Sequence, residues 1–254
     1  LGWITKVRML EYKKNSLHLN QIDLAHVAKK HGTPVYVYSL DEIEKRILNY
    51  FEAFGGEVDI HYATKANANK KVLKRIKKLG AGVDVVSAGE AKEALEAGFD
   101  AKDIIFSGVA KTEKEIRFAI SKSIKQINIE SPQELERVGS LAKKAKRKAR
   151  VAFRLNPDVN PETHPYITTG FRENKFGMDR GFLPELESIL KKYKKHIELV
   201  GVTIHIGSQL LDIDVIGEAI NKTIPIYKHF QAEGHAMGRF DVGGGVGIPY
   251  KSSQ

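Results

Sequence analysis

Lys65 is the residue of this sequence whose position most directly suggests chemistry. It lies in the stretch HYATKANAN, residues 61–69, where a short β-favouring run ends and a helical pattern begins. A lysine at such a junction is either an ordinary surface residue or a nucleophile that points into a site. Partial burial and a nearby cation would activate its amine for Schiff-base chemistry. The position alone leaves both interpretations open.

Polar residues also follow the other apolar runs of the chain. In a (β/α)8 barrel, functional side chains lie at the carboxyl ends of the strands. Here those ends carry a set that is polar, mixed in charge and supplied with one lysine, and this composition predicts a binding site. Besides Lys65, the set comprises Asp84, Ser87, Ser107, Glu130, Arg154, Asn156, His205, Ser208 and Asp241.

A glycine-rich segment, Gly243-Gly244-Gly245, follows the last of these runs. Glycines let backbone N–H groups close around an anion, and barrels commonly bind phosphate after strands seven and eight. On its own, the segment is equally typical of a flexible turn. Together with Lys65 it predicts a phosphorylated ligand that is held at one end and bonded at the other, and Ser208 could add a hydroxyl to the phosphate.

Two further residues keep alternative interpretations. His205 lies in an apolar run, so it is either a core histidine or, at a barrel mouth, a ring that stacks on a flat ligand. Arg154 is either the ion-pair partner of Glu130 or a clamp for a carboxylate. The sequence contains no HExxH or similar metal-ligand spacing, so we expect no metal.

These residues must be positioned by the strands and helices that alternate along the chain. Short runs that are mostly apolar on both faces, as in buried parallel strands, alternate with amphipathic helical stretches. This order predicts a parallel sheet with right-handed crossovers, and eight runs favour a closed (β/α)8 barrel. The runs are residues 35–38, 58–63, 83–87, 104–108, 127–130, 151–155, 201–207 and 240–244.

The boundaries of the pattern are marked as well. Residues 1–33 do not fit the alternation and are expected to form a lead-in segment, with the barrel domain at 34–254. Residues 156–182 form a connection too long for a plain turn, which is typical of a functional loop. Capping boxes with Pro132 at a first helical position predict helix starts; the pairs are Ser87 with Glu90, Thr112 with Glu115, and Ser131 with Glu134.

Composition excludes several classes of protein. The 254 residues are 42% hydrophobic, enough for a core, with no run of the length that spans a membrane. The absence of Cys excludes disulfides and thiolate sites, and we expect a cytoplasmic protein. The net charge of +10 could indicate nucleic-acid binding, but the densest basic run, residues 143–150, suits a helix end and lacks aromatic residues. We therefore expect no nucleic-acid partner.

Seven segments of the chain, in order and with natural spacing, resemble the diaminopimelate decarboxylases. These enzymes belong to the alanine-racemase-like, fold-type III class that uses pyridoxal 5'-phosphate. The loop with THPYITTG and the segment HIGSQ resemble this branch more than the ornithine decarboxylases. The seven segments are YATKAN, GVDVVSAGE, IIFSGVAKTEKEI, NIESPQEL, FRLNPDVNPETHPYITTGFRENKFGM, HIGSQ and FDVGGGVGI.

The resemblance implies an activity and a set of roles. The reaction would be the loss of CO2 from meso-2,6-diaminopimelate to give L-lysine, a lyase reaction of lysine biosynthesis. Lys65 would hold the cofactor, His205 would stack on its ring, and Lys65 and His205 are the matching catalytic residues. The matching cofactor-binding residues are Lys65, Asp84, Glu90, Arg154, His205, Ser208, Gly243, Gly244 and Gly245.

The chain also departs from the family pattern. A strand with the motif E-P-G-R, whose Glu pairs with the pyridine nitrogen, and a C-terminal β-domain would follow Gln254. By resemblance, residues 35–38 are a lead-in strand, 58–63 are barrel strand one and 240–244 are strand seven, so strand eight is missing. We therefore expect a fragment of a homodimeric enzyme that is poorly active or inactive alone. A decarboxylation rate near that of an intact enzyme would contradict this expectation.

Three alternatives remain at this point. The first is another fold-type III decarboxylase or racemase with a different substrate. The second is a non-catalytic, one-domain pyridoxal-phosphate carrier, against which stand the lead-in segment and the long 156–182 loop. The third is an aldolase-type barrel that forms a Schiff base without the cofactor, although such lysines usually come from a late strand and Lys65 ends an early one.

Overall fold

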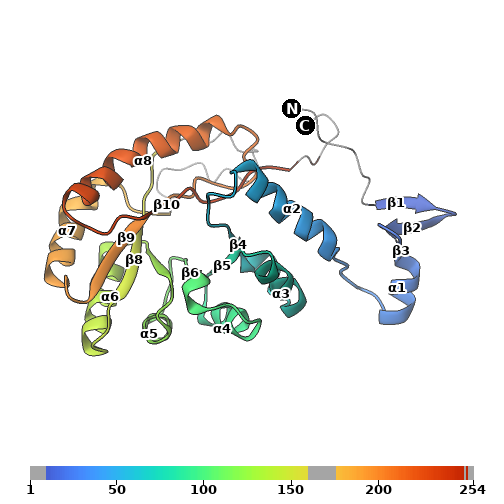
Figure 1. Cartoon of the computed structure of the whole chain (residues 1–254), viewed down its shortest axis with the longest axis horizontal. Coiled ribbons are helices and arrows are strands. Elements are labelled where there is room, and N and C mark those ends of the chain that lie inside the picture. The colour runs from blue at the N-terminus through green and yellow to red at the C-terminus, as the bar shows by residue number, and fades with distance from the viewer. Residues whose placement is uncertain (1–9, 160–175, 249, 251–254) are drawn as a thin grey trace. The chain divides into compact units, whose positions relative to one another are not determined.

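The computed structural model describes residues 10–159, 176–248 and 250 (Figure 1). By packing, the chain divides into two units, Leu1–Gly56 and Glu57–Gln254. This division falls later than the boundary between residues 33 and 34 expected from the sequence, and the assignment of a lead-in segment and a barrel domain stays a proposal. Each unit is described separately below.

The first unit begins with a small antiparallel meander that the sequence pattern did not predict. It consists of β1 (Leu10–Lys13), β2 (Ser16–Leu19) and β3 (Ile22–Asp23). Lys14 and Asn15 join the first two strands with φ values of 48° and 65°, as the two central residues of a tight hairpin turn require. Helices α1 (Leu24–His31) and α2 (Leu40–Ala53) follow.

Residues 35–38 contradict the expectation of a lead-in strand. They have no regular secondary structure, and Tyr36 and Tyr38 are exposed. The run is rich in β-favouring residues, but a strand also needs a partner for its backbone N–H and C=O groups. Within the described chain, no strand pairs with these four residues.

The second unit is built on one parallel sheet of seven strands in the order β10-β9-β8-β7-β6-β5-β4. Each strand pairs with its neighbour in sequence, as right-handed β-α-β units require. The prediction of a barrel-type α/β sheet that lacks its last strand is confirmed for the described residues. The strands are β4 (His61–Ala63), β5 (Gly82–Val85), β6 (Ile104–Phe106), β7 (Gln126–Ile129), β8 (Ala149–Arg154), β9 (Ile197–Thr203) and β10 (Arg239–Asp241).

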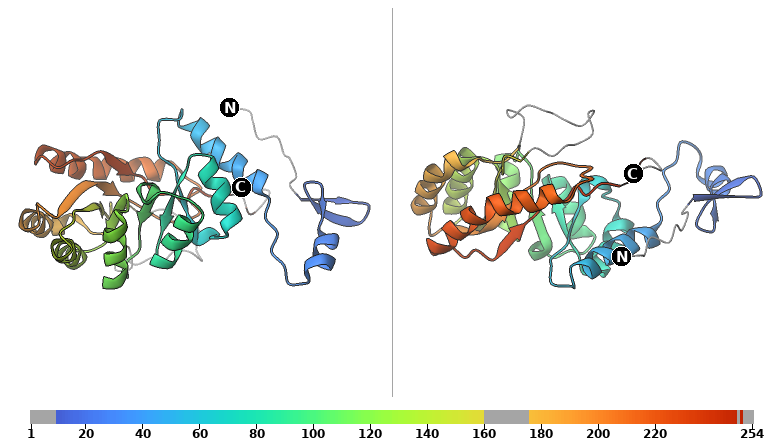
Figure 2. Two further views of the ribbon diagram at one scale, coloured as in Figure 1. Left: turned by 60° about the horizontal axis from the view of Figure 1, so that its bottom comes forward. Right: turned by 90° about the horizontal axis from the view of Figure 1, so that it is seen from above.

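Helices line the outer side of this sheet (Figures 1 and 2). Their apolar faces and both faces of the strands form the core, in which Phe106, Phe153 and Phe230 are fully buried. The six helices are α3 (Lys70–Lys78), α4 (Ala88–Glu96), α5 (Glu113–Lys122), α6 (Pro132–Lys144), α7 (Leu183–Lys192) and α8 (Asp214–Ala232), with short 3-10 turns η1 (Thr64–Ala66), η2 (Ala101–Asp103) and η4 (Arg180–Phe182).

The amino ends of the strands, here called the bottom of the sheet, are held by charged side chains. The Arg239 guanidinium, on edge strand β10, donates to the Lys125 carbonyl at 3.1 Å, and the Lys125 ammonium pairs with Asp59 at 2.7 Å. Asp59 lies two residues before β4, which is the opposite edge strand of the sheet. The sheet therefore curls, because its two edges both connect to the start of β7.

Candidate active site

Lys65 follows β4 in the short turn η1, at the carboxyl end of the sheet, here called the mouth. Its side chain is exposed, whereas the preceding Thr64 is buried. The Thr64 hydroxyl lies 2.6 Å from Glu90 Oε2 and 3.0 Å from the Asp84 carbonyl. Glu90 Oε2 also accepts the Val86 N–H at 2.8 Å. A buried threonine and a glutamate from α4 thus fix the turn that presents the Lys65 amine.

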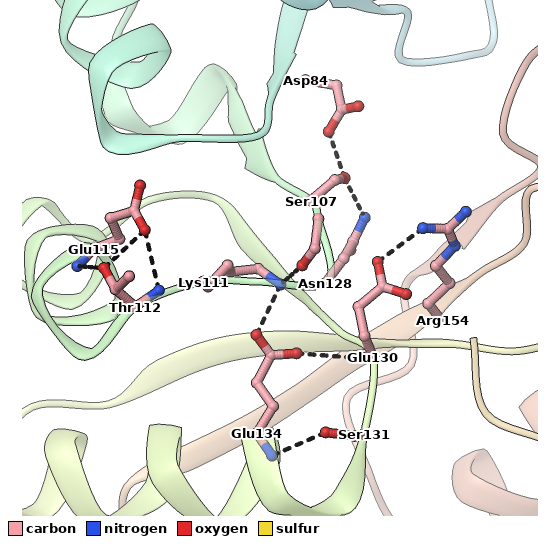
Figure 3. Close-up of polar contacts among 11 residues, drawn as sticks. Asp84, Ser107, Lys111, Thr112, Glu115, Asn128, Glu130, Ser131, Glu134 and Arg154 are labelled. Carbon is pink, nitrogen blue, oxygen red and sulfur yellow. Dashed lines mark hydrogen bonds and ion pairs between the residues drawn. The ribbon is translucent and has the colours of Figure 1, made fainter. Parts of the chain in front are cut away.

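Asp84, on β5, begins a chain of hydrogen bonds across the sheet (Figure 3). Ser107 Oγ donates to Asp84 Oδ1 at 2.5 Å, Asn128 Nδ2 donates to Ser107 Oγ at 2.9 Å, and Gln126 Nε2 donates to Asn128 Oδ1 at 2.7 Å. Burial raises the pKa of Asp84 to about 6, and the Asp241 charge adds to this, while Ser107, Lys65 and Arg154 act in the opposite direction. Asp84 therefore lies within electrostatic range of Lys65.

Arg154 and Glu130 form an ion pair, which is one of the two arrangements that the sequence left open. Arg154 Nη1 donates to Glu130 Oε1 at 2.8 Å, and the two side chains are 13% and 4% exposed. Glu130 Oε2 is buried and has no hydrogen-bond partner among the described residues. An acceptor left in that state is costly, so this oxygen marks a position where a donor from a ligand would be stabilised.

His205 follows β9 and is partly buried at the same end of the sheet. Burial, together with the positive charges of Arg154 and Lys65, lowers its pKa to about 4. The imidazole is therefore neutral near pH 7, and its Nδ1 accepts the Gly244 N–H at 3.5 Å. A neutral, flat ring held beside two cations suits stacking on an aromatic ligand better than binding a carboxylate.

The glycine-rich segment packs directly against the segment that contains His205. Gly243 and Gly245 have φ values of 74° and 93°, a region that side-chain-bearing residues rarely adopt. A Cβ at Gly245 would collide with the Gly207 carbonyl, whereas one at Gly244 would meet no atom within 4 Å. Leu210 N–H donates to the Gly245 carbonyl at 2.8 Å, which joins the two loops. The exposed Ser208 lies in the first of these loops, between His205 and Leu210.

Asp241, at the end of β10, supports this loop rather than standing apart from it. Its Oδ1 accepts the Gly243 N–H at 2.8 Å and its Oδ2 accepts the Thr203 hydroxyl at 2.9 Å. Burial raises the pKa of Asp241. The structure thus brings together Lys65, Asp84, Arg154, His205 and Asp241, with the glycine loop beside them.

Other predicted residues lie outside this group or have a different task. Ser87 caps α4 by accepting the Glu90 N–H at 3.1 Å. The Asn156 carboxamide accepts the Asp158 N–H at 3.0 Å within its own turn. Most of the predicted 156–182 loop, residues 160–175, lies outside the described residues. Its flanks help to line a cavity of about 450 Å³.

Sequence reasoning missed three groups that hold the site in place: the Thr64 hydroxyl, the Asn128 amide, and the buried pair of Lys111 with Glu134. The pair joins Lys111 Nζ to Glu134 Oε1 at 2.8 Å. A polar residue in an otherwise apolar strand, as Asn128 is, was a signal available in the sequence. Lys111 offered none, because a lysine before a helix is usually exposed.

Metal-ligand clusters and membrane-spanning helices are two further features relevant to function. In that part of the chain, no group of three or more His, Cys, Asp or Glu side chains is arranged to hold a metal ion. No described helix is both long enough and apolar enough to cross a membrane.

The chain is similar to a family of known enzymes. The family model described as pyridoxal-dependent decarboxylase, pyridoxal binding domain, matches residues 40–254. The diaminopimelate decarboxylase of Aquifex aeolicus is 43% identical over 243 residues, which cover 95% of this chain and 57% of that protein. The enzyme of the same name from Campylobacter jejuni is 42% identical, with 92% and 58% covered. The chain thus spans a little over half the length of these relatives.

The chain is also similar to solved structures of decarboxylases. The diaminopimelate decarboxylase of Helicobacter pylori complexed with L-lysine aligns with a TM-score of 0.85 at 41% identity, covering 91% of this chain and 59% of that one. The arginine decarboxylase of Paramecium bursaria Chlorella virus aligns with a TM-score of 0.76 at 24% identity, covering 88% and 58%. The second likeness carries the fold alone.

Proposed function

This chain belongs to the pyridoxal-dependent decarboxylases, and we propose that it binds pyridoxal 5'-phosphate and serves the decarboxylation of meso-2,6-diaminopimelate to L-lysine and CO2. The observation that carries the proposal is that three functional side chains converge at the mouth. An accessible amine, Lys65, stands within electrostatic range of the acid Asp84 and the neutral ring of His205.

The residues present fit this cofactor in three respects. Lys65 offers the amine that an aldehyde requires, His205 offers a flat neutral ring, and the loop at Gly243–Gly245 offers a turn that side chains would block. The buried Glu130 Oε2, which has no hydrogen-bond partner among the described residues, supports a ligand donor at this position. When bound, pyridoxal phosphate supplies an electron sink for the charge left by departing CO2.

Each residue then has a proposed task. Lys65 holds the cofactor, and His205 packs against its ring. Ser208 and the loop of Gly243, Gly244 and Gly245 contact its phosphate; in this structure the Gly243 and Gly244 N–H groups donate to Asp241 and His205. Arg154, oriented by Glu130, supplies a fixed positive charge.

Two acidic residues have proposed tasks near the amine. Asp84 has a pKa raised to about 6 and can therefore hold or release a proton near neutral pH. Glu90 contacts Thr64 rather than open space. We propose that it positions the Lys65 turn.

The substrate, the assembly and the location are finer parts of the proposal. The names of the relatives, and the L-lysine complex of the Helicobacter pylori enzyme, support diaminopimelate as the substrate. The resemblance supports a homodimer and a cytoplasmic location. A different amino-acid substrate on the same fold is the alternative, for which the viral arginine decarboxylase is an example.

The experiment is a product assay on the chain supplied with pyridoxal phosphate. Meso-2,6-diaminopimelate and L-arginine are offered separately, and L-lysine and agmatine are quantified by mass spectrometry. We expect L-lysine from the first, no agmatine from the second, a rate below that of the full-length Helicobacter pylori relative, and no product from Lys65→Ala. Agmatine without L-lysine would overturn the proposed substrate. No product at all from a chain that carries one cofactor on Lys65 would contradict catalysis by this chain.

A further inference from the structure

Lys111 and Glu134 form a second buried ion pair. Neither residue is among those predicted at the carboxyl ends of the strands. The Lys111 side chain is 0% exposed and that of Glu134 is 9% exposed, and Lys111 Nζ lies 2.8 Å from Glu134 Oε1 (Figure 3). Lys111 Nζ also donates to the Gly108 carbonyl at 2.5 Å. A fully buried lysine is rare unless its charge is paired, so this one has been placed at the cost of desolvating two charges.

The pair fastens two segments that each carry a group of the site. Through Gly108, Lys111 holds the connection after β6, which contains Ser107, the donor to Asp84. Glu134 Oε2 accepts the Glu130 N–H at 2.8 Å, and so holds the residue that pairs with Arg154.

Glu130 depends on this backbone contact for its orientation. One of its carboxylate oxygens accepts from Arg154 at 2.8 Å, and the other has no partner among the described residues. Without the Glu134 contact, Glu130 could rotate toward solvent and take Arg154 with it. The hydrogen bond from Glu130 N–H to Glu134 closes a continuous path from Lys111 to Arg154.

We propose that Lys111 and Glu134 are a positioning pair, which holds Glu130–Arg154 and Ser107–Asp84 in the geometry that faces Lys65. This inference rests on the proposed function, since it concerns the same site. Among the described residues, neither side chain has a hydrogen bond or ion pair with Lys65, Asp84 or His205. Each acts through the backbone of a neighbouring segment.

Stability alone does not account for the pair. Apolar residues of similar volume at two such positions often leave a protein equally stable or more so. What apolar residues would not supply is the acceptor for Glu130 N–H and the donor to Gly108. The specific contribution of the pair is therefore orientation.

The chain offers a matched control at the next helix. Glu115 occupies the same third position of α5 that Glu134 occupies in α6, and its carboxylate accepts the Thr112 and Ala88 N–H groups at 3.0 and 3.1 Å. Through Ala88 it holds the start of α4, which carries Glu90, but neither of these bonds reaches Glu130 or Arg154. Glu115→Gln keeps an oxygen acceptor and therefore changes a capping glutamate without changing the contacts of Glu130 and Arg154.

The test compares the double variant Lys111→Met/Glu134→Met with Glu115→Gln. In the chain without cofactor, NMR follows the Arg154 Nε–H signal, the Glu130 amide signal and the carboxyl titration of Asp84. We expect the double variant to unfold at a temperature close to that of Glu115→Gln. We also expect its Arg154 and Glu130 signals to shift, and its Asp84 midpoint to move by about half a pH unit or more. The dissociation constant for pyridoxal phosphate should rise about tenfold or more.

Unchanged NMR signals, Asp84 midpoint and cofactor affinity in the folded double variant would overturn the proposal. If the double variant does not fold, Glu134→Gln decides, because its amide has one oxygen acceptor where the carboxylate uses two, so it cannot keep both the Lys111 and the Glu130 contacts. Altered Arg154 and Asp84 signals in that variant support the proposal, and unaltered ones overturn it. If the wild-type chain binds no pyridoxal phosphate, the proposed function fails, but the cofactor-free NMR comparison still judges the pair.

Discussion

The mouth and the bottom of the sheet both bury titratable side chains, but they do so in different ways. His205 at the mouth and His61 at the bottom each have a pKa lowered to about 4, mainly by burial. Around His61, the charged Lys125 is satisfied by Asp59, whose side chain is 72% exposed. Around His205, acids and bases are buried together beside the accessible Lys65.

This difference shows which property marks a site. A depressed histidine pKa is common to both ends and therefore does not distinguish them. What distinguishes the mouth is the convergence of opposite charges on an accessible amine. A buried polar atom without a partner among the described residues does not, since it occurs at both ends, as Glu130 Oε2 at the mouth and His61 Nε2 at the bottom. Strand ends of this type of sheet are where function is expected.

The largest expected effect is on stability at the mouth. Glu130→Ala leaves the Arg154 guanidinium buried without its partner, and breaking a buried pair in this way costs about 3–5 kcal/mol. Chemical denaturation should show this loss. Glu113→Ala, which breaks an exposed pair with Arg117, is the control and should cost less than about 1 kcal/mol. Equal losses in both variants would contradict the contrast between buried and exposed pairs.

The two histidines predict a pH dependence that both ends share. Each has a folded pKa of about 4, below the ordinary 6.5, so the unfolded chain binds the proton more tightly. The stability from each histidine is fully present above pH 6.5 and is lost as the pH falls toward 4, by at most about 3 kcal/mol. Asp84, with its raised pKa, acts in the opposite direction in this window.

Single variants separate these contributions. Denaturation midpoints of His61→Gln and His205→Gln, measured from pH 7 to pH 4, should each fall less steeply than that of the wild-type chain. Of the two histidine contributions, bound pyridoxal phosphate should change only that of His205. A cofactor effect of the same size on His61→Gln and His205→Gln would remove the distinction between the two ends.

The glycine loop predicts a smaller and more local effect. Gly245→Ala puts a Cβ against the Gly207 carbonyl at a φ of 93°, whereas Gly244→Ala meets nothing within 4 Å. Strain of this kind costs about 1–3 kcal/mol, which corresponds to a loss of about fivefold to a hundredfold in affinity for pyridoxal phosphate if the loop must distort. Fluorescence titration of both variants measures this, and equal affinities would contradict a phosphate-binding role for the turn.

The smallest effect is expected at the bottom. Lys125→Ala removes a pair whose acidic partner is largely exposed, and such pairs contribute about 0–1 kcal/mol. The Arg239 contact to the Lys125 carbonyl is kept, since it uses the backbone. Thermal unfolding should therefore change little, and cofactor binding not at all. A clear loss of cofactor affinity would show that the bottom is coupled to the mouth.

The sequence predicted the sheet and the helix starts well because both follow from local patterns. Apolar runs and capping residues are read within a few positions, and the complete capping box of Thr112 with Glu115 forms as expected. Sequence patterns failed where a segment's structure depends on pairing with another segment. Residues 35–38 favour a strand but find no neighbour in the described chain, and β1–β3 turn at Lys14-Asn15 without the glycine that usually marks such a hairpin.

For the candidate site, the sequence indicated which residues meet at the mouth but not their contacts, and their functional roles stay a prediction. Lys65, Asp84 and His205 follow from the rule that function lies at strand ends. The pairing of Arg154 with Glu130 was one of two possibilities, because sequence does not show distance. Glu134 reads as a capping glutamate, yet its carboxylate binds Lys111. That contact depends on tertiary packing between two β-α units.

We propose above that the mouth binds pyridoxal phosphate through Lys65, and trapping the bound cofactor examines this attachment itself. The chain is incubated with pyridoxal phosphate, reduced with borohydride and mapped by mass spectrometry, with Lys65→Ala and the exposed Lys74→Ala treated in parallel. We expect one adduct on Lys65 in the wild-type chain and in Lys74→Ala, and none at a defined position in Lys65→Ala. Labelling scattered over many lysines, or unchanged labelling in Lys65→Ala, would contradict attachment at Lys65.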